Sequence, residues 1–225
     1  MTRFDYDSLP KQYNLYKTNK QQSRVFNLDM ETNGEGNFSP PTQTPTQISW
    51  TVSTFDGILL SEKDYIVKGA ISVKPGLQNS LSVEKIEKDG VPIGDVLEEF
   101  YSMLRPIDFI VCHNASFDVG LLLRYKSPPF PLTNVICTMK ELTNFCKIPS
   151  KFRYGDQKYK WPKLSEAASR LNIKLEDDKL HDSLYDCQIL QQVFLKAFKK
   201  NLFKFHVIED DQKKEIDQDW VSINL

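Results

Sequence analysis

The sequence contains no apolar run long enough to cross a membrane, and residues 1–24 are polar, without the apolar core of a secretory signal peptide. It contains no Cys-x-x-Cys pair among its four cysteines, and no internal repeat. These absences argue against a membrane protein, a secreted protein and a repeat array. We therefore expect a soluble protein inside the cell, cytoplasmic or nuclear, whose thiols are reduced and mostly buried.

The chain also lacks the excess of positive charge that is common in proteins that bind nucleic acid, because its 29 basic and 30 acidic residues give a net charge of −1. Local charge matters more than the sum. Between Lys147 and Lys163 there are six basic residues, one acid and four aromatic residues. This pattern fits a single-stranded nucleic acid, with cations on phosphates and rings under bases, and fits equally an ordinary solvated loop anchored by its aromatics.

A length of 225 residues with 40% hydrophobic and 26% charged residues favours one α/β domain with a sizeable core. We expect a polar N-terminal segment over residues 1–22, the domain over 23–205 and a charged tail over 206–225. The tail is either a docking segment or a frayed end.

Two acids follow one another closely in Leu28-Asp-Met-Glu-Thr-Asn-Gly34. The preceding residues favour a strand, and residues two apart on a strand face the same side, so Asp29 and Glu31 should lie together at its carboxyl end. Carboxylates so close repel each other unless a cation or proton lies between them. In isolation, an ordinary turn with solvated acids explains the pattern as well.

A second acid, Asp118, follows the apolar run 107–112 and the residues His113 and Asn114. The run predicts a buried strand and residues 117–125 predict a helix, which places Asp118 where strand passes into helix. By itself, an acid in the first turn of a helix is explained by the helix dipole.

The third stretch, His181-Asp-Ser-Leu-Tyr-Asp186, opens the longest amphipathic pattern of the chain. Asp186 falls near the edge of the apolar stripe, whereas His181 would point away from it in a continuous helix. Both can serve one site only if His181 precedes the regular helix. Such a histidine suits a general base, or is simply a surface histidine near a helix start.

Taken together, the three stretches supply four carboxylates and one imidazole. This set suits a pair of divalent cations that hold the attacking and leaving oxygens of phosphodiester hydrolysis.

In this order, Asp-x-Glu-Thr-Asn-Gly, His-Asn-x-x-Phe-Asp and His-x-x-x-x-Asp resemble the three motifs of the DEDDh class of 3′→5′ exonucleases, which are DnaQ-like members of the RNase H-like superfamily. The resemblance runs from about Val25 to Phe198. It implies two ions, Mg²⁺ or Mn²⁺, and a histidine base. The implied metal ligands are Asp29, Glu31, Asp118 and Asp186, the base is His181, and the candidates to hold the terminal nucleotide are Met30, Thr32, Asn114 and Phe117.

Two regions depart from the family pattern. Many members carry a His-Gly-Ile-Thr-like segment where this chain has Asn79-Ser-Leu-Ser82, which puts contacts made there in doubt. The polar connection between Asn33 and Gln47 is longer than a hairpin requires, and is either a lid beside the substrate or a disordered insertion.

The expected fold is an RNase H-like α/β fold, with a five-stranded mixed sheet flanked by helices. The sheet should contain three antiparallel strands followed by two parallel ones, with a hairpin turn at Asp56-Gly57. The expected strands are 24–30, 46–54, 63–71, 107–112 and 133–137, and the expected helices are 93–104, 117–125, 138–146, 163–172 and 183–200.

These expectations predict a metal-dependent 3′→5′ exonuclease that releases nucleoside 5′-monophosphates from DNA. Its partners would be single-stranded 3′ ends and replication or repair proteins, with no membrane. Two alternatives stay open: a 3′→5′ exoribonuclease with the same five residues, and an inactive nucleic-acid-binding module.

Overall fold

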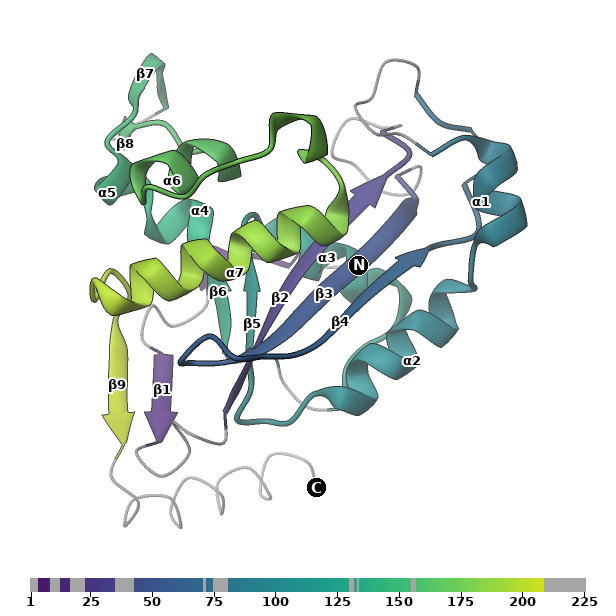
Figure 1. Ribbon diagram of the computed structural model, residues 1–225, viewed down its shortest axis with the longest axis horizontal. Coiled ribbons are helices and arrows are strands. Elements are labelled where there is room, and N and C mark those ends of the chain that lie inside the picture. Colours follow the sequence, from purple (N-terminus) through teal and green to yellow (C-terminus); the bar gives the residue numbers. More distant parts are fainter. Residues whose placement is uncertain are drawn as a thin grey trace.

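A five-stranded mixed sheet forms the centre of the protein in the computed structural model, which describes residues 4–8, 13–16, 23–34, 43–70, 72–74, 81–129, 132, 134–154 and 157–208. Its strand order is β4-β3-β2-β5-β6 (Figure 1). The first three strands are antiparallel, and β5 and β6 continue parallel to β2. This is the expected topology. The strands are β2 (Arg24–Thr32), β3 (Pro45–Thr54), β4 (Leu59–Ile66), β5 (Phe109–Cys112) and β6 (Val135–Cys137).

Helices cover both faces of this sheet. The longest, α7 (Ser183–Lys199), crosses the face drawn in front in Figure 1 and contacts β2, β3 and β4. On the opposite face lie α2 (Ile93–Met103) and α3 (Ala115–Tyr125). The remaining helical segments are η1 (Tyr6–Ser8), α1 (Val83–Asp89), α4 (Thr138–Glu141), α5 (Thr143–Cys146), α6 (Leu164–Arg170) and η3 (Asp177–Lys179).

The alternation of side chains along β2 divides the core in two. Phe26, Leu28 and Met30 are buried with residues of α2 and α3. Val25 packs instead with the residues of α6 and α7. Because strand residues alternate between faces, Asp29 is directed toward α7 rather than toward the α2 and α3 layer.

Two small sheets lie outside the central one. Strands β1 (Tyr13–Tyr16) and β9 (Phe205–Ile208) pair in parallel, and β7 (Pro149–Tyr154) pairs with β8 (Gln157–Tyr159). None of these four strands was predicted. Strands this short give too little periodic pattern to be recognised before their partners are known.

Two of the predicted elements differ from the structure, and helix α1 was not predicted. The strand predicted at 63–71 is β4, Leu59–Ile66, because pairing resumes soon after the turn at Asp56-Gly57. The helix predicted at 138–146 is broken at Leu142 into α4 and α5. At this break the Thr143 hydroxyl donates to the Met139 carbonyl at 2.8 Å, a local bond that competes with the regular helix.

All four cysteines are free and buried, as expected. Within the described residues, no helix is both long and apolar enough to cross a membrane. Most of the 33–47 connection, residues 79 and 80, and the tail from residue 209 lie outside the described part of the chain. The predictions made for them, and the domain boundaries, stay predictions.

Candidate active site at the carboxyl ends of the central strands

The structure brings the three sequence motifs to one end of the sheet. Asp29 and Glu31 lie at the carboxyl end of β2, and Asp118 lies in the first turn of α3, which follows β5. Because β2 and β5 are adjacent and parallel, their carboxyl ends meet at the same edge. The start of α7 adds His181 and Asp186 to this edge.

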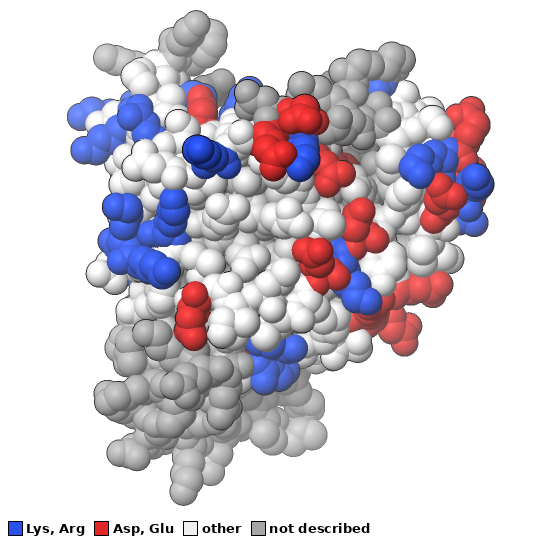
Figure 2. Space-filling model, in the orientation of Figure 1, with Lys and Arg blue, Asp and Glu red and all other residues white. Residues whose placement is uncertain are grey.

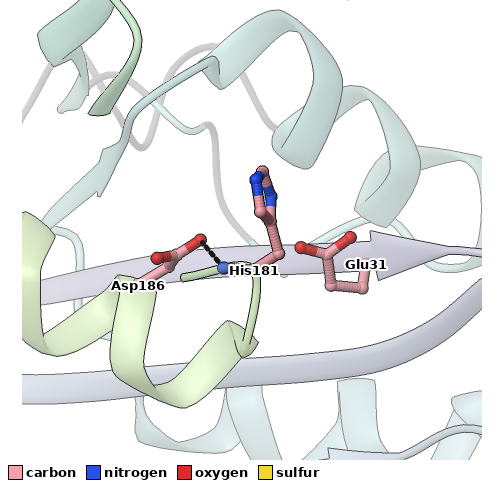
Figure 3. A group of neighbouring side chains, drawn as sticks. All are labelled: Glu31, His181 and Asp186. Atoms are coloured by element: carbon pink, nitrogen blue, oxygen red, sulfur yellow. Dashed lines mark hydrogen bonds between the residues drawn. The ribbon is translucent and has the colours of Figure 1, made fainter. Parts of the chain in front are cut away.

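Three of these side chains form a compact group. Glu31, His181 and Asp186 each offer one ligand atom, and these atoms lie within 4.8 Å of one another. Figure 3 shows the imidazole standing between the two carboxylates. The backbone N–H of His181 also donates to Oδ2 of Asp186 at 3.3 Å, which ties the histidine segment to the helix it precedes.

His181 lies outside the regular helix, which is the position that the predicted shared site with Asp186 requires. Helix α7 begins at Ser183, and His181 has a φ of 69°. This left-handed backbone is unusual for a residue with a side chain. The imidazole rises from this segment at a position between Glu31 and Asp186 (Figure 3).

Asp29 and Asp118 have the most strongly perturbed pKa values of the four carboxylic acids. Burial raises the pKa of Asp29 well above its ordinary value, and the nearby carboxylates of Asp118, Glu31 and Asp186 raise it further. The pKa of Asp118 is also raised by burial, although backbone N–H groups, including that of Met30, partly oppose the rise.

The outer carboxylates are less strongly perturbed. Burial, with the charges of Asp186 and Asp182, raises the pKa of Glu31 to about 7. Burial likewise raises the pKa of Asp186 to about 6, while the neighbouring His181 opposes the rise. Near neutral pH, the isolated protein therefore holds several acids that resist losing their protons together.

Two buried carboxylate oxygens have no hydrogen-bond partner among the described residues: Oδ2 of Asp29 and Oδ1 of Asp186. A buried oxygen without a partner is costly. A hard divalent cation such as Mg²⁺ or Mn²⁺ takes oxygen ligands and would both satisfy these atoms and favour the ionised acids. The donor set therefore fits a divalent metal centre.

Three residues that were not predicted brace this centre. Ser183 donates from Oγ to the carbonyl of Asp29 at 2.9 Å, joining α7 to β2. Asp182 caps α7 by accepting from the Tyr185 N–H at 3.0 Å. The Tyr185 hydroxyl accepts from the Glu176 N–H at 2.7 Å and thereby holds the segment that leads to His181. Asp182 was recognisable as a capping residue before an apolar helix, but the other two contacts depend on tertiary structure.

His113, which belongs to the second motif, is fixed by hydrogen bonds through both ring nitrogens. Its Nδ1 lies 3.0 Å from Oγ1 of Thr138, and its Nε2 lies 2.9 Å from the carbonyl oxygen of Pro162. Burial lowers the pKa of His113 to about 4, so the ring is neutral near pH 7. It links the strand end before Asp118 to the segment before α6.

The four residues predicted to hold a terminal nucleotide lie beside the carboxylates in sequence but differ in exposure. The Met30 side chain is buried in the core, which leaves only its backbone for such a role. Thr32 accepts from the Gln43 side chain at 3.2 Å, Asn114 precedes α3, and Phe117 is partly buried against the core. Their role stays a prediction.

The model of the RNase T family, which is described as an exonuclease, matches residues 73–194, more than half of the chain. The chain belongs to this family. As an RNase T family member it is similar to the DNA polymerase III subunit epsilon of Salmonella typhimurium, with 31% identity over 104 residues, 45% of this chain and 40% of the relative. The matched part thus spans less than half the length of that relative.

Solved structures agree on the fold of this RNase T family chain. An E. coli exonuclease I in complex with a dA16 oligonucleotide matches with a TM-score of 0.62 and 16% identity, covering 81% of this chain and 42% of that one. A 3′-exonuclease described by its 3′-end-specific recognition of a histone mRNA stem-loop matches with a TM-score of 0.62 and 14% identity, covering 80% and 84%. The expected RNase H-like fold and DnaQ-like DEDDh resemblance are confirmed.

Proposed function

We propose that this protein is a metal-dependent 3′→5′ exonuclease that removes nucleoside 5′-monophosphates from DNA. The observation that carries the proposal is the convergence of four carboxylates and His181, two of whose buried carboxylate oxygens have no hydrogen-bond partner in the described part of the chain. Membership of the RNase T exonuclease family supports it, and the likeness to a DNA polymerase III subunit favours DNA as substrate.

Asp29, Glu31, Asp118 and Asp186 would hold two ions, Mg²⁺ or Mn²⁺. When bound, the ions would polarise the phosphodiester and offset the charge that develops on its oxygens. His181 would take the proton from the attacking water, because its ring stands free of the helix and next to Glu31 and Asp186. The backbone bond to Asp186 keeps this ring over the carboxylates.

The terminal nucleotide would lie against the segments next to the carboxylates. Thr32 and Phe117 would contact it with their side chains, Asn114 would lie at the amino end of α3, and Met30 would contribute its backbone only. Single-stranded 3′ ends fit this arrangement best, because the nucleotide must separate from a complementary strand to reach a buried site. Replication or repair proteins are the expected partners, by likeness to the polymerase subunit.

The deciding experiment is digestion of end-labelled single- and double-stranded oligonucleotides of both sugars, with Mg²⁺, with Mn²⁺ and with a chelator. Stepwise shortening of DNA from the 3′ end, with release of 5′-monophosphates and loss of activity in the chelator, is the expected result. Faster shortening of RNA would replace DNA by RNA in the proposal. Binding without cleavage under every condition would leave only a nucleic-acid-binding module.

A further inference from the structure

Trp161 is a large aromatic residue that the protein leaves half exposed. It lies between β8 and α6, and its side chain is 50% accessible, whereas Trp50 is completely buried in the core. It lies within the basic and aromatic segment 147–163. Residues 155 and 156 and the side chains of residues 151–154 of that segment lie outside the described part of the chain.

The backbone on both sides of Trp161 is held in place. The Lys160 N–H donates to the carbonyl of Ile148 at 3.0 Å, and the Pro162 carbonyl accepts from the ring of His113 at 2.9 Å. The Lys160 ammonium is also bonded to both carboxylate oxygens of Glu166, at 2.7 and 2.8 Å. An exposed ring on a fixed backbone loses little conformational entropy when a ligand stacks on it.

The indole is held from the side as well. Nζ of Lys140 lies 5.5 Å from the centre of the Trp161 ring and 5.6 Å from that of Tyr6, and it forms an ion pair with Asp7. This lysine is itself largely buried, with 14% of its side chain exposed. This contact restricts the position of the Trp161 ring. The charge of Lys140 is already paired with Asp7, so Lys140 is not counted among the cations that could contact a phosphate.

Exposed cations flank the ring along the chain. Lys158 and Lys163 are exposed, and neither forms a close ion pair with a carboxylate among the described residues, although the charge of Lys163 also acts on Glu166. Figure 2 shows Lys and Arg side chains gathered on the left of the face it draws, over α5, α6 and the C-terminal end of α7. Asp and Glu gather in the middle and on the right of that face. A polyanion is therefore favoured on the side of the molecule that carries α6.

Trp161 is also connected to the end of the sheet that carries the carboxylates. His113, which bonds to Pro162, directly follows β5 and lies five residues before Asp118. Helix α4, which carries Lys140, begins directly after β6 at the same edge of the sheet. A nucleic-acid strand whose 3′ end lies at the carboxylates can thus leave the site along the surface that carries Trp161.

We propose that Trp161 is a stacking site for a nucleobase of single-stranded nucleic acid, on the 5′ side of the terminal nucleotide, with Lys158 and Lys163 contacting the adjacent phosphates. This inference rests on the proposed function and adds a second contact region to it. Stacking on an aromatic ring tolerates any base sequence, whereas a paired duplex keeps its bases stacked on each other. The site therefore selects single strands.

The test compares Trp161→Ala and Trp161→Phe in the full chain. Affinity is measured for a fluorescent single strand of about 10 nucleotides, a length typical of such sites. The Asp118→Asn background is used so that turnover does not consume the ligand. We expect Trp161→Ala to weaken binding about tenfold and Trp161→Phe to weaken it less, because one ring is kept. Tyr125→Ala removes a similarly exposed aromatic residue, 43% accessible, and should leave affinity unchanged.

A second measurement separates stacking from a structural effect. The p-nitrophenyl ester of thymidine 5′-monophosphate contains the scissile bond but no upstream base, so Trp161→Ala in the otherwise wild-type chain should hydrolyse it at the normal rate. Equal affinity of Trp161→Ala and its parent for the single strand would overturn the inference. It would also be overturned if Trp161→Ala hydrolysed the nitrophenyl ester more slowly by the same factor as it loses affinity for the single strand. Absence of hydrolysis by the wild-type protein would instead count against the proposed function, while the binding comparison would still decide the role of Trp161.

Discussion

Buried carboxylates lie at both ends of the central strands, and their surroundings are opposite. Asp108, just before β5, is clamped by two arginines: Nη2 of Arg24 lies 2.7 Å from its Oδ2, and Nη2 of Arg105 lies 2.9 Å from its Oδ1. It also accepts the backbone N–H groups of both arginines, each at 2.9 Å. Asp29 and Asp118, at the carboxyl ends, face other acids instead.

The comparison distinguishes an acid that stabilises the fold through ion pairs from acids whose charge has no compensating partner among the described residues and could be compensated by a bound cation. At the Asp108 end the buried carboxylate is neutralised by two guanidinium groups of the chain itself, so this carboxylate needs no further ligand. At the other end the same residue type raises the energy of the folded protein, because burial and mutual repulsion oppose ionisation. Such a cost is expected at a functional site and not in a structural one.

The largest effect should come from removing charge at the unbalanced end. Asp29→Asn or Asp118→Asn keeps the side-chain shape, and we expect hydrolysis to fall by about a thousandfold or more. The melting temperature of the metal-free variants should be equal to or higher than that of the wild type, because a repelling charge has gone. Near-normal metal-dependent activity in either variant would show that the assigned ligands are wrong.

The opposite end should lose stability instead of activity. Asp108→Ala leaves two arginines without their partner, and we expect the free energy of unfolding to fall by about 3 kcal/mol. The loss is not larger because both arginines can still reach solvent. Urea unfolding measures this loss. The rate of hydrolysis per folded molecule of Asp108→Ala should equal that of the wild type. If this variant lost activity but not stability, Asp108 would not be a structural acid and the contrast between the two ends would be wrong.

Divalent metal should stabilise the protein through one end only. At about 100 times its Kd, Mn²⁺ is expected to raise the melting temperature by about 5–10 °C relative to the chelated protein. Asp108→Ala should keep this increase although its starting value is lower, and Asp29→Asn should lose most of it. An equal increase in all three proteins would mean that the metal binds elsewhere.

The metal-free protein should become less stable as pH rises. The pKa of Glu31 is raised to about 7 in the fold, so the folded state holds its proton more tightly than the unfolded state does. Stability attributable to Glu31 is therefore full below about pH 4.5 and falls until about pH 7. A shift of this size corresponds to about 3 kcal/mol, so we expect a drop of about 7 °C in melting temperature across this range, in chelator. Glu31→Gln should flatten the profile, and an unchanged slope in that variant would contradict the assignment.

The smallest effect should come from a neutral contact that positions His181. Tyr185→Phe removes the hydroxyl that accepts from Glu176, and we expect kcat to fall about fivefold with KM nearly unchanged, the value of one ordinary hydrogen bond. In a His181→Ala background the same change should have no further effect on kcat. Additive losses would show that Tyr185 acts independently of the histidine.

The sequence predicted which motifs would meet at this edge of the sheet, because the information for their position is local. Each motif lies where a strand or helix begins or ends, and parallel neighbours bring β2 and β5 together without further detail. The position of His181 outside the helix followed from angular spacing together with the assumption that His181 and Asp186 serve one site. What the sequence could not show is which residues support the motifs, since Ser183 reaches Asp29 across 154 positions of the chain.

The ends of the chain were the weakest part of the prediction for the same reason. Tyr6 and Tyr13 belong to a segment with polar composition, yet both are buried. Their hydroxyl groups approach each other and both donate to Glu141 Oε1, at 2.8 and 3.0 Å. A burial pattern that depends on one distant carboxylate leaves no periodic trace in the sequence.

Through Tyr6 and Tyr13, the segment that precedes the central sheet supports the surface along which the nucleic-acid strand is proposed to lie. A fragment trimmed to begin at residue 23 would leave Glu141 without the two hydroxyl groups that solvate it. It would also take Asp7 and the Tyr6 ring away from Lys140, the lysine that touches Trp161. Because Tyr6 and Tyr13 are also part of the buried core, such a shortening would lower stability as well as disturb the surroundings of Trp161.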